Sequence, residues 1–328
     1  MSTQTFVVGR RDADQTVAAF LRARLNLSWS QTKRLVETGR VRVAQQKVVD
    51  PAFRLKLGKQ VDVVTEESTP QAKPTRAKLA DAPRYDGPQP VLVYSDDAIV
   101  VVDKPAGLTT MRHAEEAEEF GERAKKFLPV TLADLLPAML GRPGKKVVPV
   151  HRIDRDTSGL VVFARTKPAA KSLEEQFKAH TIERQYLAIV RGQAQSQTIQ
   201  SEFVRNRGDG RRGSGEDGQL AVTQVKVKEQ FAKCTLVECR LETGRTHQVR
   251  IHLGEAGTPL CGERLYDRPL HGAPYPDHSG ANRPMLHAAR LALTHPVTGE
   301  RMQWKSEPPA DFQRLLDSLR DSAATNSS

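Results

Sequence analysis

The sequence contains few cysteines, with only Cys234, Cys239 and Cys261 among 328 residues. An odd number without a CxxC pair argues against a disulfide framework and a cysteine-ligated zinc site, and fits a reducing compartment. No apolar run approaches the roughly 18 residues that a membrane helix needs, and residues 1–10 lack the hydrophobic region of a signal peptide. We therefore expect a cytoplasmic protein without a membrane partner.

Patterns for a bound cofactor are also missing. The histidines at 113, 180, 287 and 295 do not have the spacing of metal ligands. The glycine-rich segment 204–219 lacks the strand and helix that flank a nucleotide-binding loop. The sequence therefore predicts no metal and no organic cofactor.

Positive charge is abundant and unevenly distributed. The chain has 50 Lys and Arg against 39 Asp and Glu, a net charge of +11. Residues 1–65 hold 12 of the basic and 5 of the acidic residues, a balance of +7, which leaves +4 for the rest. A chain of this length is expected to form two domains. The charge indicates that the first is a small module that binds a polyanion.

The basic segment 1–65 has the pattern of a compact module. Apolar residues at helical spacing after residue 14 predict one helix, and Ser28 with Gln31 predicts the start of a second that Gly39 ends. Alternating residues at 41–43 and 60–63 predict short strands. The whole pattern resembles the S-four type of RNA-binding module. This resemblance implies RNA contacts from residues around the second helix and the following turn, namely Lys33, Arg34, Arg40 and Arg42; on charge alone, a solvated basic face is the alternative.

The remaining chain divides into a linker, a large domain and a tail. Residues 66–90 are rich in proline without an apolar period, which is typical of a semi-extended linker. Residues 319–328 are polar, and we expect a disordered tail. In the domain between them, 91–318, the predicted strands are 91–94, 99–102, 159–164, 186–190, 223–227, 235–240 and 249–253. The predicted helices are 131–140, 169–178, 248–256 and 311–319, so that one helix and one strand prediction overlap. Strands that outnumber helices without alternating with them predict an α+β fold with a mixed sheet.

The densest group of reactive side chains lies in "VHRIDRDTSGLVVFART", residues 150–166. A charged loop before a buried strand is a common way to present reactive groups, although a salt-bridged surface turn has the same composition. The segment resembles the signature of the RluA-type pseudouridine synthases, which isomerise uridine in RNA. Four further segments resemble the family in the expected order: "VVDKPAGL", "ERQYLAIVRG", "LETGRTHQVRIHL" and "LHAARLALTHPVTGE". Together the five span about residues 91–315, and they imply the mixed, mainly antiparallel sheet of that family.

The resemblance assigns roles to particular residues. Asp154 matches the catalytic aspartate, and a carboxylate can attack or stabilise a sugar cation when a glycosidic bond breaks. Because burial raises the pKa of a carboxylate, a neighbouring guanidinium must offset it, and Arg250 resembles that partner. Tyr186 would stack on the flipped uracil, Leu286 would pack beneath the base, and Arg152 would take the place of the extruded base. Arg245 is a candidate for a phosphate contact or for bracing its loop. The alternatives for Tyr186 and Leu286 are plain core side chains, and for Arg250 a phosphate-binding or surface arginine.

The predicted function is the isomerisation of uridine in structured RNA. Resemblance favours large-subunit ribosomal RNA as the substrate over transfer RNA. We also expect a monomer. A catalytically silent RNA-binding or ribosome-assembly factor is the alternative from another class. Two further segments have no assigned role: residues 112–127 are expected to form a peripheral helical insertion, and residues 204–219 a flexible basic loop that reaches around RNA, or a disordered one.

Overall fold

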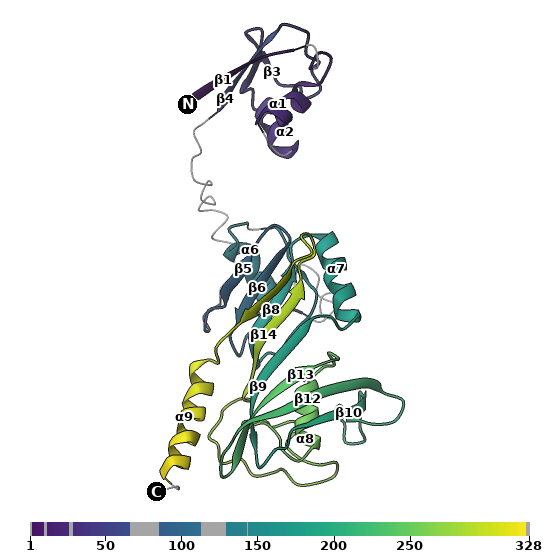
Figure 1. The fold of residues 1–328 in the computed structure, drawn as a ribbon, viewed down its shortest axis with the longest axis vertical. Coiled ribbons are helices and arrows are strands. Elements are labelled where there is room, and N and C mark those ends of the chain that lie inside the picture. Colours follow the sequence, from purple (N-terminus) through teal and green to yellow (C-terminus); the bar gives the residue numbers. More distant parts are fainter. Residues whose placement is uncertain are drawn as a thin grey trace. The chain divides into compact units, whose positions relative to one another are not determined.

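The computed structural model describes residues 2–9, 12–25, 29–65, 85–112, 129–142 and 144–325. The chain forms two compact units, Met1–Lys73 and Pro74–Ser328 (Figure 1). Residues 66–84, most of the predicted linker, and residues 113–127, most of the predicted insertion, lie outside the described residues.

The first unit combines two helices with a four-stranded antiparallel sheet in the order β1-β4-β2-β3. Its elements are β1 (Ser2–Val7), α1 (Val17–Leu25), α2 (Trp29–Glu37), β2 (Val41–Val43), β3 (Gln46–Val48) and β4 (Gln60–Thr65). Both predicted helices and both predicted strands are present, and β1 and β3 are additional. The unit has its own apolar core, in which Val17, Phe20, Leu21, Val61 and Val63 are almost completely buried.

The second unit is built on one large sheet. Its strands are β5 (Val91–Ser95), β6 (Ile99–Lys104), β7 (Val148–Pro149), β8 (Ser158–Ala164), β9 (Glu183–Arg191), β10 (Gln197–Val204), β11 (Gly213–Ser214), β12 (Gln219–Gln230), β13 (Cys234–Leu241), β14 (Leu286–Thr294) and β15 (Arg301–Lys305). The main path runs β11-β10-β12-β13-β9-β14-β8-β6-β5. Figure 1 shows β5, β6 and β8 in one half of the unit and β10, β12 and β13 in the other, with β9 and β14 between them.

The sheet is mixed and mainly antiparallel, which confirms the predicted α+β class. Among the named strands of the described residues, only β8 and β14 pair in parallel, through Ser158 with His287 and Gly159 with Ala288. Gly159 has a φ of +111°, and an added Cβ would lie 2.4 Å from the carbonyl oxygen of Ala288. Only glycine allows this close approach of two backbones, and it occurs directly after the loop that carries Asp154.

The helices are α6 (Leu132–Met139), α7 (Lys167–Lys178), α8 (Gln248–Glu255) and α9 (Ala310–Thr325). The overlap at residues 248–256 is therefore decided in favour of the helix, and the strand predicted at 249–253 is wrong. Nearly every side chain of α8 is buried, including Val249, Ile251 and Leu253. Val249, Ile251 and Leu253 stand at every second position, a spacing that also fits a strand, so periodicity alone does not distinguish the two structures here.

Both predicted domain edges need correction. The tail predicted to be disordered from 319 continues α9 as far as Thr325. Leu319 and Ala323 pack against the core cluster of Phe312, and Arg320 Nε bonds Glu229 Oε2 of β12 at 2.8 Å. This polar segment therefore still carries apolar residues at helical spacing, and they pack the helix against the core. Near the end of the predicted linker, Tyr85 packs against the large core of the second unit, so the packed domain begins before residue 91.

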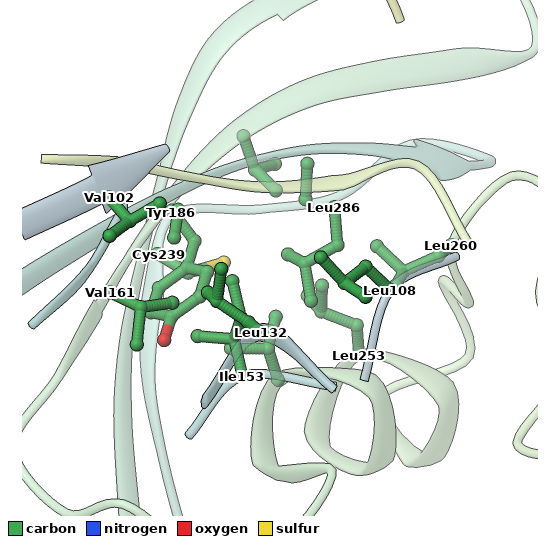
Figure 2. Packing of buried hydrophobic residues seen from close by; sticks show 14 of the residues in the cluster. Val102, Leu108, Leu132, Ile153, Val161, Tyr186, Cys239, Leu253, Leu260 and Leu286 are labelled. Carbon is green, nitrogen blue, oxygen red and sulfur yellow. The ribbon is translucent and has the colours of Figure 1, made fainter. Parts of the chain in front are cut away.

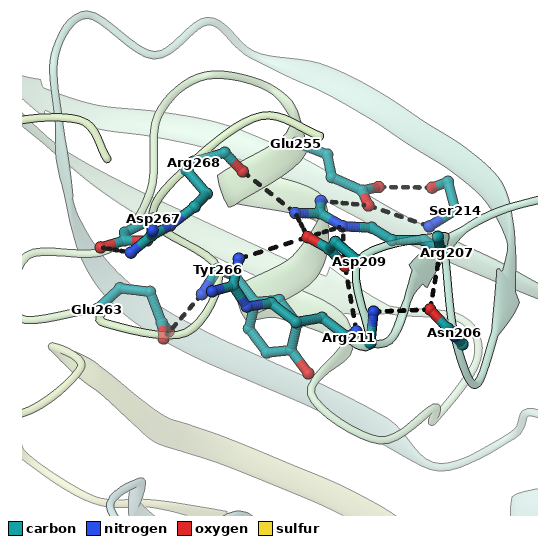
Figure 3. Close-up of polar contacts among 12 residues, drawn as sticks. Asn206, Arg207, Asp209, Arg211, Ser214, Glu255, Glu263, Tyr266, Asp267 and Arg268 are labelled. Atoms are coloured by element: carbon teal, nitrogen blue, oxygen red, sulfur yellow. Dashed lines mark hydrogen bonds and ion pairs between the residues drawn. The ribbon is translucent and has the colours of Figure 1, made fainter. Parts of the chain in front are cut away.

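The segment between β10 and β12 is ordered, contrary to the prediction of a flexible or disordered loop. Figure 3 shows the hydrogen bonds and ion pairs that surround Arg207. The Arg207 side chain is 3% exposed and pairs with Asp209 at 3.0 Å and with Glu255 of α8 at 3.3 Å. Ser214 of β11 also bonds Glu255. Basic and acidic residues of this segment therefore pair with each other and with α8.

Within the described residues, no helix is long and apolar enough to span a membrane.

Candidate active site

Asp154 lies in the loop between β7 and β8, and this loop is held by its backbone. Three backbone carbonyl oxygens of this loop each accept a hydrogen bond from a side chain that lies outside the loop. Thr110 Oγ1 donates to Ile153 O at 2.7 Å, Lys104 Nζ to Arg155 O at 3.0 Å, and Arg283 Nη1 to Asp156 O at 3.0 Å. Buried carbonyls that lack partners would cost free energy, so these three bonds fix the conformation that presents Asp154.

His151 at the start of the loop has a structural role. Its Nε2 accepts the backbone N–H of Val162 in β8 at 2.9 Å, and its ring lies 4.8 Å from that of Phe177. Burial lowers the pKa of His151 to about 3, so that the ring is neutral and Nε2 remains an acceptor at pH 7.

The carboxylate of Asp154 faces a guanidinium, as the sequence predicted. Arg250 Nη1 lies 3.3 Å from Asp154 Oδ2. The other edge of the same guanidinium is bound by Glu263, with Nε to Oε2 at 2.7 Å and Nη2 to Oε1 at 2.8 Å. Burial would lower the pKa of Arg250, but Glu263 and Asp154 outweigh it and raise the pKa above its ordinary value. A permanent cation is therefore fixed beside Asp154.

Glu263 is the buried counter-charge in this arrangement. Its side chain is completely inaccessible, and Oε1 also accepts the backbone N–H groups of Leu265 at 2.9 Å and Arg264 at 3.1 Å. Burial would raise the pKa of Glu263, but the hydrogen bonds and charge of Arg250 hold it below the usual value. The bidentate contact restricts Arg250 to one orientation.

His247 and Tyr266 complete the surroundings of the carboxylate. His247 precedes α8 in the left-handed conformation, with a φ of +59°. Its Nε2 lies 3.8 Å from Asp154 Oδ1, and its Nδ1 is 2.7 Å from the Tyr266 hydroxyl. Burial lowers the pKa of His247, with Asp154 opposing the effect. The Tyr266 ring lies 5.3 Å from the Arg250 guanidinium, within range of a cation–π contact.

A cavity of about 460 Å³ opens beside Asp154. Its lining includes all six site residues predicted in the large domain: Arg152, Asp154, Tyr186, Arg245, Arg250 and Leu286. Asp154 is the only carboxylate among the lining residues, whereas the arginines and a lysine supply several cations. The sequence-predicted residues, which span 135 positions of the chain from 152 to 286, are thus brought together around one hollow.

Tyr186 and Leu286 belong to the core as well as to the cavity. They are 7% and 4% exposed, and Figure 2 shows them in one apolar cluster with Ile153 and Val161. Burial raises the pKa of Tyr186 above its usual value. The two interpretations of these side chains are therefore compatible, because each packs in the core and lines the cavity.

Arg152 and Arg245 differ in how they are held. Arg152 is exposed and lines both this cavity and a second one of about 460 Å³, which Asp154, His247 and Arg250 also line. Arg245 is half-buried, and its Nε donates to Leu220 O at 2.9 Å. That bond braces the loop before α8 against the start of β12.

The basic residues predicted in the first unit lie around α2 and β2. Lys33 is exposed, with Nζ 3.7 Å from Glu37 one helical turn away. Arg40, just before β2, and Arg42, within it, are both exposed, and Arg42 is paired in register with Lys47 of β3. The side chain of Arg34 lies outside the described residues.

Sequence reasoning did not identify His247, Glu263 or Tyr266 as site residues. His247 stands inside the segment "HQVR" that gave Arg250, and its proximity follows from the same turn. Glu263 and Tyr266 belong to "GERLYD", which has no signal of its own beyond an acidic and an aromatic residue three positions apart. In the part of the chain that the structure describes, no three His, Cys, Asp or Glu residues form a group able to hold a metal.

The carboxylate of Asp154 thus lies beside the guanidinium of Arg250, at a cavity that the ring of Tyr186 also lines. The sequence profile of the RNA pseudouridylate synthases matches residues 98–255, and the chain is 34% identical over 98% of its length to a curated pseudouridine synthase, so it belongs to that family. It is therefore an RNA pseudouridine synthase, which converts uridine in RNA into pseudouridine.

The similarity to curated relatives extends over nearly the whole chain. The chain is 34% identical to ribosomal large subunit pseudouridine synthase C of Escherichia coli K12, with 98% of both chains covered. It is 36% identical to ribosomal large subunit pseudouridine synthase D of Zymomonas mobilis, with 89% of this chain and 90% of the relative covered.

Among solved structures, the human RNA pseudouridylate synthase domain containing 4 protein matches with a TM-score of 0.56 and 24% identity. The match covers 70% of this chain and 92% of the human one. At this identity the likeness concerns the fold alone.

Proposed function

We propose that this enzyme isomerises one or more uridines of large-subunit ribosomal RNA, with Asp154 as the catalytic carboxylate. The substrate proposal is supported by the names of the relatives from Escherichia coli and Zymomonas mobilis, both of which are large-subunit enzymes. The observation that carries the catalytic proposal is the 3.3 Å contact between Asp154 and Arg250 at the wall of a cavity that also contains Tyr186.

The chemistry requires an ionised carboxylate. Isomerisation breaks the bond between C1′ of the ribose and N1 of uracil, turns the base, and joins C1′ to carbon 5. A carboxylate can form an ester bond with C1′ as N1 leaves, or add to carbon 6 of the base, and both routes start from the anion. Arg250 places a fixed cation 3.3 Å from the carboxylate that would react.

The remaining side chains suit a flipped nucleotide. The uridine must leave its stack to reach Asp154, and the ring of Tyr186 offers a face for the extruded base. Leu286 supplies an apolar surface beneath it. The exposed Arg152 lies outside the core and can enter the space left in the RNA, and Arg245 can contact a phosphate at the rim.

Tritium release tests the catalytic assignment. RNA labelled with tritium at carbon 5 of uracil should lose its label to water with the wild-type enzyme. Asp154→Asn and Asp154→Ala should abolish release while RNA affinity stays within about threefold. Asp97→Asn removes a surface carboxylate that is 94% exposed and serves as the matched control. Full activity of either Asp154 variant would disprove its role, and no release by the wild-type enzyme would favour a silent RNA-binding factor.

Mapping pseudouridines tests the substrate. Total RNA from cells with and without the gene should differ at positions in large-subunit ribosomal RNA. A difference confined to transfer RNA would overturn the proposed substrate and leave the enzyme class intact.

We also propose that the first unit binds RNA through Lys33, Arg40 and Arg42. Because this unit has a core of its own, the enzyme lacking residues 1–65 is expected to fold and to retain catalysis on short RNA. Removing one phosphate contact should reduce the slope of log affinity against log salt by about 0.7 to 0.9. Arg40→Ala with Arg42→Ala should therefore lower the slope by about 1.5. An unchanged slope in both variants would exclude a phosphate-binding role.

We expect the enzyme to act as a cytoplasmic monomer, which light scattering of the purified protein would test.

A further inference from the structure

Arg184 lies in the active-site cavity and is not explained by the roles described so far. It stands on β9 two residues before Tyr186, and side chains two apart on a strand point to the same face of a sheet. Both residues line the cavity that contains Asp154. Strand β9 therefore presents an aromatic ring and a guanidinium together to the substrate space.

The guanidinium of Arg184 has few partners. Its Nη2 donates to the backbone oxygen of Thr243 at 3.1 Å, and its Nε is buried without an acceptor. Among the described residues, no carboxylate forms an ion pair with Arg184. A guanidinium has five N–H donors, so most of the hydrogen-bonding capacity of this group is unused.

Other arginines buried in the same unit are paired with acids. Arg250 has Glu263, Arg283 has Asp311 with Nε to Oδ2 at 2.7 Å, and Arg207 has Asp209. A buried charge is ordinarily paired, because leaving it alone is costly. Arg184 departs from this pattern at the cavity that Asp154 also lines.

The surroundings of Arg184 keep it cationic and leave room for it. Its guanidinium lies 5.4 Å from the centre of the Phe177 ring, a cation–π contact that favours the charge. A Cβ at position 244 would lie 2.5 Å from Nη1, so that Gly244 leaves the space that the guanidinium occupies. Burial lowers the pKa of Arg184, but arginine starts so high that it stays protonated at neutral pH.

We propose that Arg184 is a catalytic residue whose unpaired guanidinium binds a carbonyl oxygen of the flipped uracil and stabilises the negative charge that the base acquires during the reaction. This inference rests on the proposed function and adds a second group to it. Asp154 acts on the bond that forms, and Arg184 acts on the electrons that the base receives.

The need for such a cation is the same in both chemical routes. If the carboxylate forms a bond to C1′, the C1′–N1 bond breaks and its electron pair moves onto N1 and the two carbonyl oxygens of uracil. If the carboxylate adds to carbon 6, the electron pair of the C5–C6 double bond moves through C4 onto its oxygen. In the completed reaction C1′ is bonded to carbon 5, carbon 5 has lost its proton and N1 has gained one. No oxidant or co-reactant is required.

The test compares neutral and cationic replacements of Arg184 under single-turnover conditions. Arg184→Gln should lower the rate of isomerisation by about 100-fold, the usual cost of removing one donor that stabilises a developing anion. RNA affinity and its salt slope should change little. Arg184→Lys, which keeps a cation, should recover at least about tenfold of the loss. Arg301→Gln, which removes a surface arginine that is 42% exposed and pairs with Glu183, is the matched control and should keep the wild-type rate.

A second substrate separates catalysis from folding. Fluorine at carbon 5 withdraws electrons and stabilises an anionic base. The rate loss of Arg184→Gln should therefore be several-fold smaller with RNA containing 5-fluorouridine. Because the fluorinated base has no proton to lose from carbon 5, the rate compared is that of C1′–C5 bond formation, measured by nuclease digestion, chromatography and mass spectrometry of the rearranged nucleoside that keeps its fluorine. If the Gln variant does not fold, Arg184→Met, which retains the contact with Phe177, replaces it.

Each outcome decides the inference. Equal losses on both substrates would make Arg184 a structural residue, and an unchanged rate with weaker, less salt-dependent binding would make it a phosphate contact. Either result overturns the proposal while wild-type tritium release still supports the proposed function. No conversion of any RNA by the wild-type enzyme would instead refute the proposed function.

Discussion

Glu263→Gln is the most informative single change near the active site, because it removes one charge and preserves the shape. The carboxylate of Glu263 accepts two hydrogen bonds from Arg250 and others from the backbone of the following residues. A glutamine has one acceptor oxygen and an amide that can only donate. Either Arg250 or the backbone N–H groups would then face a donor.

The cost of this change follows from burial. The Glu263 side chain is completely inaccessible and that of Arg250 is 13% exposed. Removing one partner of a buried ion pair costs about 3 to 5 kcal/mol. In a unit of this size each kcal/mol lowers the melting temperature by about 2 to 4 °C, so a fall of about 10 °C is expected. Because Arg250 loses its fixed orientation beside Asp154, the isomerisation rate should fall by about 100-fold.

Two measurements and a control check this reasoning. Thermal unfolding gives the stability of the variant, and single-turnover tritium release gives its rate below the transition. Glu229→Gln removes a carboxylate that pairs with Arg320 at the surface, where it is 37% exposed, and should cost less than about 1 kcal/mol with no change in rate. A Glu263→Gln enzyme with wild-type activity would refute the view that Glu263 orients Arg250.

Two further predictions concern stability. Gly159→Ala should destabilise the second unit by about 3 kcal/mol, since the new Cβ would lie 2.4 Å from a backbone oxygen that cannot move aside; urea unfolding measures this, and a decrease of less than about 1 kcal/mol would contradict it. His252 is 1% exposed, and burial lowers its pKa from 6.5 to about 4. Its neutral form is present above pH 6.5, and the unfolded chain takes up the proton first as the pH falls. Stability should therefore decrease by up to about 1.4 kcal/mol per pH unit between 6.5 and 4, and His252→Gln should flatten this slope in unfolding experiments.

The loop that carries Asp154 could be predicted because its information is local. "HRIDRDTSG" places Asp154 and Arg152 within three residues, and the following strand is a continuous apolar run. Arg250 and Tyr186 were accessible through short segments with their own patterns. For these residues, a resemblance over a few positions was sufficient to predict that they meet at one cavity.

Glu263 could not be predicted in the same way, because its role depends on tertiary contacts. It lies in a loop after α8, and only the fold brings it to the outer edge of Arg250. Helix α8 itself illustrates the same limit. Its apolar residues Val249, Ile251 and Leu253 alternate with polar ones, so the spacing that normally distinguishes a helix from a strand is absent from this segment.

For the polar segment between β10 and β12, the sequence predicted flexibility or disorder where the structure is ordered. Its glycines and charges are typical of a flexible loop, and composition contains no information about which charges meet. In the folded chain Arg207 finds Asp209 two residues away and Glu255 on α8. Order here comes from a buried ion pair between segments 48 residues apart, which no local pattern encodes.

The position of Asp154 depends on the whole second unit. The carbonyls around it are held by Lys104 and Thr110 of one segment and by Arg283 of another. Its charge partner is held by a third segment through Glu263. The backbone of the loop that carries this carboxylate is therefore held in place by contacts from several parts of the unit. Under the proposed mechanism, the residues that support the loop should matter for the reaction as much as those that contact the base.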